Sequence, residues 1–124
     1  MTMSSHTKQT VDCLRNLKAT NPNIEAASMV NSNGQIMAST FPTDIDEARV
    51  VYISATLLSA SEQLMSEIKS GVLNRITLEG SNKLLVLTAV GEDAILAVVA
   101  RSEANLGEIF DNIRSTIDDL VRLL

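Results

Sequence analysis

Residues 44–69 read DIDEARVVYISATLLSASEQLMSEIK, and the apolar pattern of this stretch decides the fold. At a helical spacing of about 100° per residue, it carries two apolar stripes side by side. The first contains Val50, Ile53, Leu57, Ala60, Leu64 and Ile68, and the second contains Val51, Ala55, Leu58 and Met65. A helix on one sheet needs a single apolar face of roughly 100°, so we expect the second stripe to face a second partner.

Strand patterns flank this helix on both sides. Residues 24–30 alternate, which predicts Ile24, Ala26, Ser28 and Val30 on one side of a strand. Asn33 and Gly34 can both adopt positive φ, which indicates a hairpin. The predicted strands are residues 24–30 and 35–40 before the helix, and 72–79, 84–90 and 94–100 after it.

Two further helices complete the chain. Residues 1–5 should be frayed, residues 7–19 should form a helix that ends before Pro22, and Asn105 with Glu108 resembles a capping box for a last helix. For the long helix, Thr43 or Asp44 should cap the start, and Gly71 should take the left-handed conformation at the end. The element order is α-ββ-α-βββ-α.

This order predicts one α+β domain over residues 1–124. We expect a five-stranded antiparallel sheet with the long helix on one face and the two narrow-striped helices on the other. A helix about 10 Å wide cannot cover a sheet about 24 Å across. The sheet and the long helix therefore both keep uncovered apolar surface, and self-association would cover it.

Composition excludes several classes of function. The net charge is -5 and only 2% of residues are aromatic, so a nucleic-acid surface built on phosphate neutralisation and base stacking is not expected. A single cysteine, Cys13, and no signal-peptide pattern fit a reducing cytoplasm. The longest apolar runs are far below the ~20 residues that span a bilayer, so direct membrane insertion is not expected.

The sequence also lacks the residue patterns that common catalytic sites require. The one histidine, His6, falls in the predicted tail and should be an ordinary solvated side chain, and Cys13 should be a small buried thiol in the first helix. No Cys and His cluster has zinc spacing, and no glycine lies in a phosphate-binding motif. We therefore expect no enzyme activity, no cofactor and no bound metal.

One segment, together with the element order, resembles the Roadblock/LC7 domain family. Residues 89–99 read AVGEDAILAVV and residues 104–107 read ANLG, which is similar to the family's late hairpin, strand and entry to the last helix. Asn33-Gly34 and the long helix fit the same pattern, so the resemblance covers about residues 5–124.

The resemblance implies a homodimer, or a heterodimer with a Roadblock paralogue, in which long helices pack antiparallel and the strands after them pair edge to edge. Matched onto this chain, the expected interface is Val51, Ser54, Ala55, Leu58, Ser61, Met65, Leu73, Arg75, Thr77 and Glu79. Members of the family regulate or scaffold Ras-like small GTPases. The candidate GTPase docking residues are Arg49, Tyr52, Thr56, Ser59 and Gln63.

Two other hypotheses remain open. The chain could be a structural adaptor that joins larger complexes, as dynein-associated relatives in the family do. It could instead be a small-molecule sensor, which would need a roomy apolar pocket under the long helix.

Overall fold

The computed structural model describes the backbone of residues 5–124 and the side chains from Thr7 onward, and it confirms the predicted order of elements. His6's side chain and residues 1–4, most of the stretch predicted to be frayed, lie outside this range, and Ser5 begins the first helix. The elements are α1 (Ser5–Thr20), β1 (Ile24–Asn31), β2 (Ile36–Ser39), α2 (Glu47–Glu67), β3 (Arg75–Glu79), β4 (Lys83–Val90), β5 (Ala94–Arg101) and α3 (Leu106–Val121).

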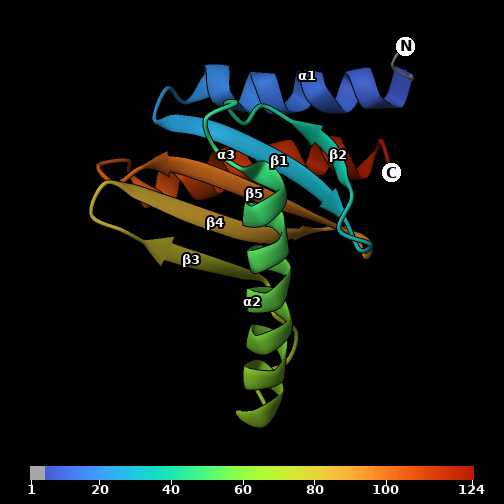
Figure 1. Ribbon diagram of the computed structural model, residues 1–124, viewed down its shortest axis with the longest axis vertical. Helices are drawn as coiled ribbons and strands as arrows, with labels where there is room; N and C mark the ends of the chain where they lie inside the picture. Colours follow the sequence, from blue (N-terminus) through green and yellow to red (C-terminus); the bar gives the residue numbers. More distant parts are fainter. Residues whose placement is uncertain (1–4) are drawn as a thin grey trace.

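The five strands form one antiparallel sheet in the order β2-β1-β5-β4-β3. Helices α1 and α3 pack together on one face, while α2 crosses the other face and continues beyond the β3 edge (Figure 1). The expectation of one long helix opposite two shorter ones is therefore confirmed. Strands β2 and β3 are the two edges of the sheet.

The main core lies between the sheet and the α1 and α3 pair. Alternate residues of β4 and β5 point into it and meet the apolar stripes of both helices, because strand side chains alternate between faces. Its most buried members include Leu14, Leu17, Met29, Val86, Leu96, Val98, Ile109 and Leu120.

The opposite face carries two rows of side chains that run across the sheet and that define the position of α2. The middle row is Ser28, Ala97, Leu87 and Ile76, and the outer row is Ala26, Val99, Leu85 and Leu78. Ser28, Ala97 and Leu87 are buried beneath α2, whereas Leu78 in the outer row is exposed. Small side chains at Ser28 and Ala97 let the helix approach the sheet closely.

The first hairpin is confirmed, but one local prediction in it was wrong and its turn differs in detail. A register shift between Ile24 and Ala26 turns Ile24 into the main core, with Ala27 and Met29, rather than onto the face of Ala26. Among the described residues, only Gly34 in this turn has positive φ, at 80°. The Asn31 amide oxygen accepts hydrogen bonds from the backbone N–H groups of Asn33 and Gln35, which favours a longer turn with one left-handed residue.

The ends of α2 also differ from the prediction. Asp46, rather than Thr43 or Asp44, is the N-cap, and its side chain accepts a hydrogen bond from the Arg49 backbone N–H. At the other end Lys69 is left-handed, with φ 54°, and the Ser70 N–H donates to the Met65 carbonyl at 2.9 Å. This is a Schellman motif with lysine where glycine is usual, and Gly71 follows it with φ 91°.

We predict that Lys69→Gly is more stable than Lys69→Ala by about 1 kcal/mol, because both remove the side chain but only glycine adopts the left-handed region without steric cost. Urea unfolding at fixed protein concentration measures the difference. Equal stability of the two variants would show that φ at this position carries no strain.

Candidate functional site

A buried hydrogen bond fixes the N-terminal half of α2 on the sheet. Ser28 lies in the middle row and is fully buried, and its hydroxyl donates to Oε2 of Glu47, in the first turn of α2, at 2.6 Å. One turn further along, Val51 is 8% exposed, and Ser54 is buried beside it. The side of α2 that carries Glu47, Val51 and Ser54 therefore faces the chain's own sheet.

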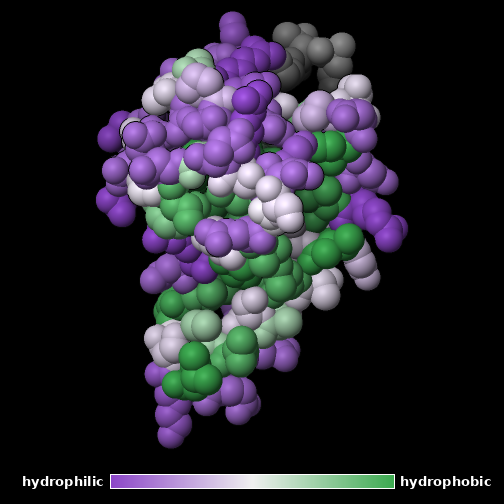
Figure 2. Space-filling view, turned by 90° about the vertical axis from the view of Figure 1, so that its left-hand side faces the viewer, coloured by the Kyte–Doolittle hydropathy of each residue, from purple (hydrophilic) through white to green (hydrophobic). Residues whose placement is uncertain are grey.

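The other apolar stripe of α2 lies on a flank of the helix, next to the side that faces the sheet, and is exposed. Leu64 is 57% and Ile68 is 61% exposed, Ile53 is exposed as well, and Val72 just after the helix is 86% exposed. Figure 2 shows hydrophobic surface over the lower half of the molecule, where α2 projects past β3 in Figure 1. A contiguous apolar surface of this kind marks an interaction site.

An apolar groove runs beside α2, between the helix and the outer row of the sheet. Its volume is about 280 Å³, and it is open to solvent. Val50, from the exposed stripe of α2, and Lys83, from β4, are two of the residues that line it. The remaining residues that line it are Gly80 and the apolar residues Phe41, Ile45, Leu78, Leu84, Leu85 and Val99.

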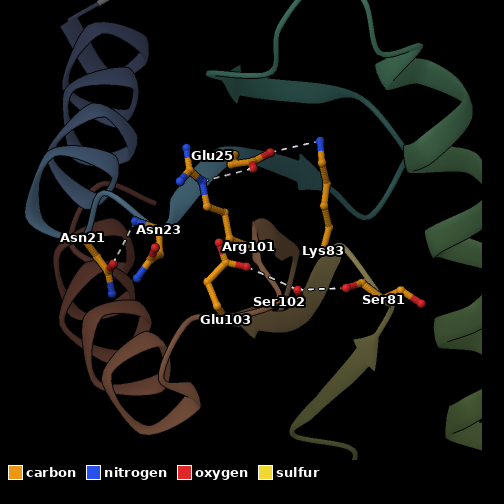
Figure 3. Close-up of polar contacts among 8 residues, drawn as sticks. All are labelled: Asn21, Asn23, Glu25, Ser81, Lys83, Arg101, Ser102 and Glu103. Atoms are coloured by element: carbon orange, nitrogen blue, oxygen red, sulfur yellow. Dashed lines mark hydrogen bonds and ion pairs between the residues drawn. The ribbon is translucent and has the colours of Figure 1, made fainter.

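Polar contacts hold the strand ends that border this groove. Glu25 pairs with Lys83 at 3.0 Å and with Arg101 at 3.7 Å, and so joins β1, β4 and β5 (Figure 3). The Ser102 hydroxyl donates to the Ser81 carbonyl at 3.0 Å, which ties the turn between β3 and β4 to the end of β5. The floor of the groove is therefore fixed rather than formed by a loose loop.

The outer edge of β3 completes the surface. Within residues 5–124, β3 pairs only with β4, so its second edge presents backbone groups that can pair with another strand. On the α3 side of the sheet, the Arg75 guanidinium lies 3.7 Å from the centre of the Phe110 ring. That cation–π contact fixes the arginine side chain on the α3 face of the sheet.

The residues predicted from sequence for a protomer interface fall into two groups. Val51 and Ser54 are already covered by the chain's own sheet, so they have almost no surface left for a partner. Leu58, Ser61 and Met65 follow them along the same side of α2 and are half-buried. The others keep accessible surface on α2, before β3 or along β3: Ala55, Leu73, Arg75, Thr77 and Glu79.

The five residues predicted for GTPase docking share one exposed stripe. They lie on the side of α2 that points away from the sheet: Arg49, Tyr52, Thr56, Ser59 and Gln63. Tyr52 is the one large aromatic side chain among them and is well exposed. The stripe is brought together by helical spacing, as its sequence positions predict.

The prediction missed part of the accessible apolar surface. Ile53, Leu64 and Ile68 were recognised as a stripe but were not assigned to an interface, and the groove residues Phe41 and Ile45 were not singled out. Periodicity identified both stripes of α2. The contact between Glu47 and Ser28, together with the burial of Val51 and Ser54, shows which stripe faces the sheet.

The described residues offer little reactive chemistry. From Thr7 onward, no group of three His, Cys, Asp or Glu residues could hold a metal ion. Burial raises the pKa of the Cys13 thiol, and the nearby carboxylates of Asp119 and Asp12 raise it further, so the thiol is a poor nucleophile. In the same part of the chain, no helix has the length and hydrophobicity required to cross a membrane.

Comparison with known proteins gives a family and a fold. A family model described as the Roadblock/LC7 domain matches residues 11–100. An uncharacterised protein of Methanocaldococcus jannaschii is 27% identical over 97 residues, which is 78% of this chain and 84% of that protein. A second from the same organism is 29% identical over 86 residues, which is 69% of this chain and 75% of that protein.

Solved structures support the same fold. Myxococcus xanthus MglB superposes with a TM-score of 0.88 at 21% identity, covering 99% of this chain and 92% of that one. A Roadblock/LC7 domain from Streptomyces avermitilis gives a TM-score of 0.81 at 16% identity, over 89% and 92% of the two chains.

We predict that Glu47→Ala lowers the free energy of unfolding by about 1–3 kcal/mol, because it leaves the buried Ser28 hydroxyl without its acceptor. Ser28→Ala should cost less, and the double variant should be more stable than Glu47→Ala alone. Urea unfolding of the four proteins gives the coupling between the two positions. Additive losses would mean that the hydrogen bond does not hold α2 in place.

Proposed function

This chain belongs to the Roadblock/LC7 domain family, and from that premise we propose that it is a dimeric, non-enzymatic regulator of a Ras-like small GTPase. It would bind the GTPase through the outward side of α2 and alter its nucleotide cycle. The observation that carries the proposal is the division of α2 into a sheet side, an exposed apolar side and an exposed polar side. Each side has a separate role.

The exposed apolar stripe is suited to a second copy of itself. Ile53 and Leu64 lie at equal distances from the midpoint between Leu58 and Ser59, and Ile45 and Val72 are also equally distant from it. An antiparallel pair of α2 helices centred there brings Ile53 of one copy against Leu64 of the other. A twofold dimer requires this kind of self-complementary surface.

The same pairing gives the projecting half of α2 a place to pack. In each copy it extends past β3, where its own sheet ends (Figure 1), and it would enter the apolar groove of the second copy. Val72, 86% exposed, would then reach the end of the groove near Ile45. A single contact between two copies would therefore cover both the projecting half of α2 and the apolar groove.

The polar side of α2 remains outward in such a dimer. Arg49 and Tyr52 supply the two side-chain types that most often dominate binding at protein interfaces, and Thr56, Ser59 and Gln63 supply hydrogen-bonding groups along the same stripe. A flat polar surface with one aromatic anchor suits a folded protein rather than a small molecule. This supports a GTPase as the client of the paired helices.

The direct test of function measures GTP hydrolysis and nucleotide release by the Ras-like small GTPases of the same organism, with and without this protein. A change in either rate, together with binding that differs between the GTP and GDP forms, supports regulation. Absence of binding to every such GTPase contradicts the proposal.

The adaptor alternative predicts a different result. A structural adaptor would bind an extended or helical peptide from a larger protein with the same affinity whether GTP or GDP is present. The sensor alternative has less support, because Leu87 and Ala97 are buried directly under α2 and the apolar groove beside the helix is open to solvent.

We predict that Leu64→Glu converts the dimer into monomer, because it places an unpaired charge in an apolar contact at a cost of about 3 kcal/mol or more. Sedimentation equilibrium measures the change, and a thermal melt checks that the variant is folded. Thr56→Glu, on the outward side of the same helix, is the matched control. A folded Leu64→Glu dimer as stable as wild type would overturn the role of the exposed stripe.

We predict that Tyr52→Ala weakens GTPase binding by about 10-fold or more while the dimer stays intact, since an exposed aromatic anchor at an interface contributes on the order of 2 kcal/mol. Calorimetric titration with the GTPγS-loaded GTPase gives the affinity. Arg15→Ala, on α1 across the sheet, should bind as wild type does. Unchanged affinity of Tyr52→Ala would remove this stripe as the docking site.

A further inference from the structure

The charges on β3 are placed so that two copies of the strand, paired antiparallel along their open edges, can set opposite charges against each other. The strand reads RITLE, residues 75–79. Arg75, Thr77 and Glu79 point to the α3 face, and Ile76 and Leu78 point to the α2 face, since Ile76 pairs with Leu87 and Leu78 with Leu85. A positive charge and a negative charge thus lie at equal distances from Thr77 on one face.

Pairing of two such edges about a twofold axis allows few registers. Residues that lie opposite each other in an antiparallel pair share a face of the sheet. The axis must therefore pass beside a residue of β3 and not between two residues, because a slip by one would turn apolar residues to the wrong face. Within the strand the candidates are its five residues: Arg75, Ile76, Thr77, Leu78 and Glu79.

The packing of the two α2 helices above the sheet reduces these five candidate positions to two. Each α2 lies over the middle row, which ends at Ile76. An axis at Ile76 would place one helix on top of the other. An axis at Leu78 would hold them about 14 Å apart, and one at Glu79 about 20 Å apart. An axis at Thr77 or Arg75 separates them by about 7 Å along the strands, near the 8–10 Å of packed helices.

The position of the exposed apolar stripe on α2 decides between the axes at Thr77 and Arg75. With the axis at Thr77, the second helix lies over the outer row, where Leu78, Leu85 and Val99 form the apolar groove. With the axis at Arg75, it lies on the other side of α2, where an acidic hollow is lined by Glu62, Glu92 and Asp93 among others. The exposed stripe of α2 faces the first of these surfaces, since Val50 lines the groove.

We propose that β3 pairs with β3 of a second copy about Thr77, and that the two resulting pairs of Arg75 with Glu79 make this chain select itself as partner. The inference rests on the dimer proposed above and adds its register and its basis of specificity. An axis at Arg75 would instead set two arginines face to face, which destabilises a strand pair.

The contact between Arg75 and Phe110 fits this role. The guanidinium lies 3.7 Å from the ring centre, so the ring covers one face of the planar group. Its N–H edges stay free to meet a carboxylate, and the side chain loses less freedom when it does so. A related chain without an acid at the position of Glu79 would leave this arginine unpaired.

Charge reversal tests the pairing directly. Arg75→Glu and Glu79→Arg each turn both pairs into repulsive ones, and each should raise the dimer dissociation constant about tenfold or more. Mixing the two variants restores both pairs, so the mixture should form heterodimer in preference to either homodimer. Native mass spectrometry with one isotope-labelled component measures the three species. Lys18→Glu and Glu92→Lys, on α1 and in the turn after β4, are matched controls.

Cysteine cross-linking tests the register without relying on charge. In a Cys13→Ser background, Thr77→Cys should form a covalent dimer under mild oxidation, because the two Cα atoms would be opposite each other, within the 4.4–6.8 Å range of disulfides. Arg75→Cys and Leu78→Cys should not. Efficient cross-linking at residue 75 or 78 instead of 77 overturns the register.

The outcomes separate this inference from the dimer itself. A wild-type chain that sediments as monomer contradicts the proposed dimer. A stable dimer in which the charge variants behave like their controls, or in which the mixture shows random pairing, leaves the dimer standing and overturns the role of Arg75 and Glu79.

Discussion

The mismatch in length between α2 and the sheet beneath it is the constraint on which the other features depend. A helix of 21 residues is about 30 Å long. Glu47 fixes its start over β1, and the open β3 edge lies only three strand spacings away, about 14 Å. Roughly half of the helix therefore has no sheet of its own to cover, yet its apolar pattern continues to Ile68.

That constraint accounts for the surfaces on which the proposed function depends. The reactive side chains are few, and the one cysteine is held in its protonated form by burial. The accessible features are instead an apolar helix side, an apolar groove and an unpaired strand edge, all on one side of the sheet or along one border of it. The paired-helix platform proposed above needs no catalytic group of its own.

Much of the fold could be predicted from sequence because its signals are local. The turn glycines, the period of 3.6 in the helices and the runs of β-branched and aliphatic residues predicted every element and the placement of helices on both faces of the sheet. The errors arose where a tertiary contact overrides local preference. Lys69 occupies a left-handed position that glycine would usually take, and a register shift after Ile24 turns that side chain into the opposite layer.

The site was predicted less completely for a physical reason. Periodicity shows that α2 has two apolar stripes, but the stripes have similar composition, so neither is marked as the sheet side. The distinction depends on Ser28, a small buried residue nineteen positions before Glu47, whose hydroxyl needs an acceptor. The exposed stripe and the groove become a single surface only when that contact is known.

The most direct test of the account is the molecular mass of the wild-type chain in solution, measured by sedimentation equilibrium across low micromolar concentrations. Mutual covering of the projecting half of α2 and the apolar groove predicts twice the 13.4 kDa mass of one chain. A folded protein that stays at 13.4 kDa over this range would contradict it.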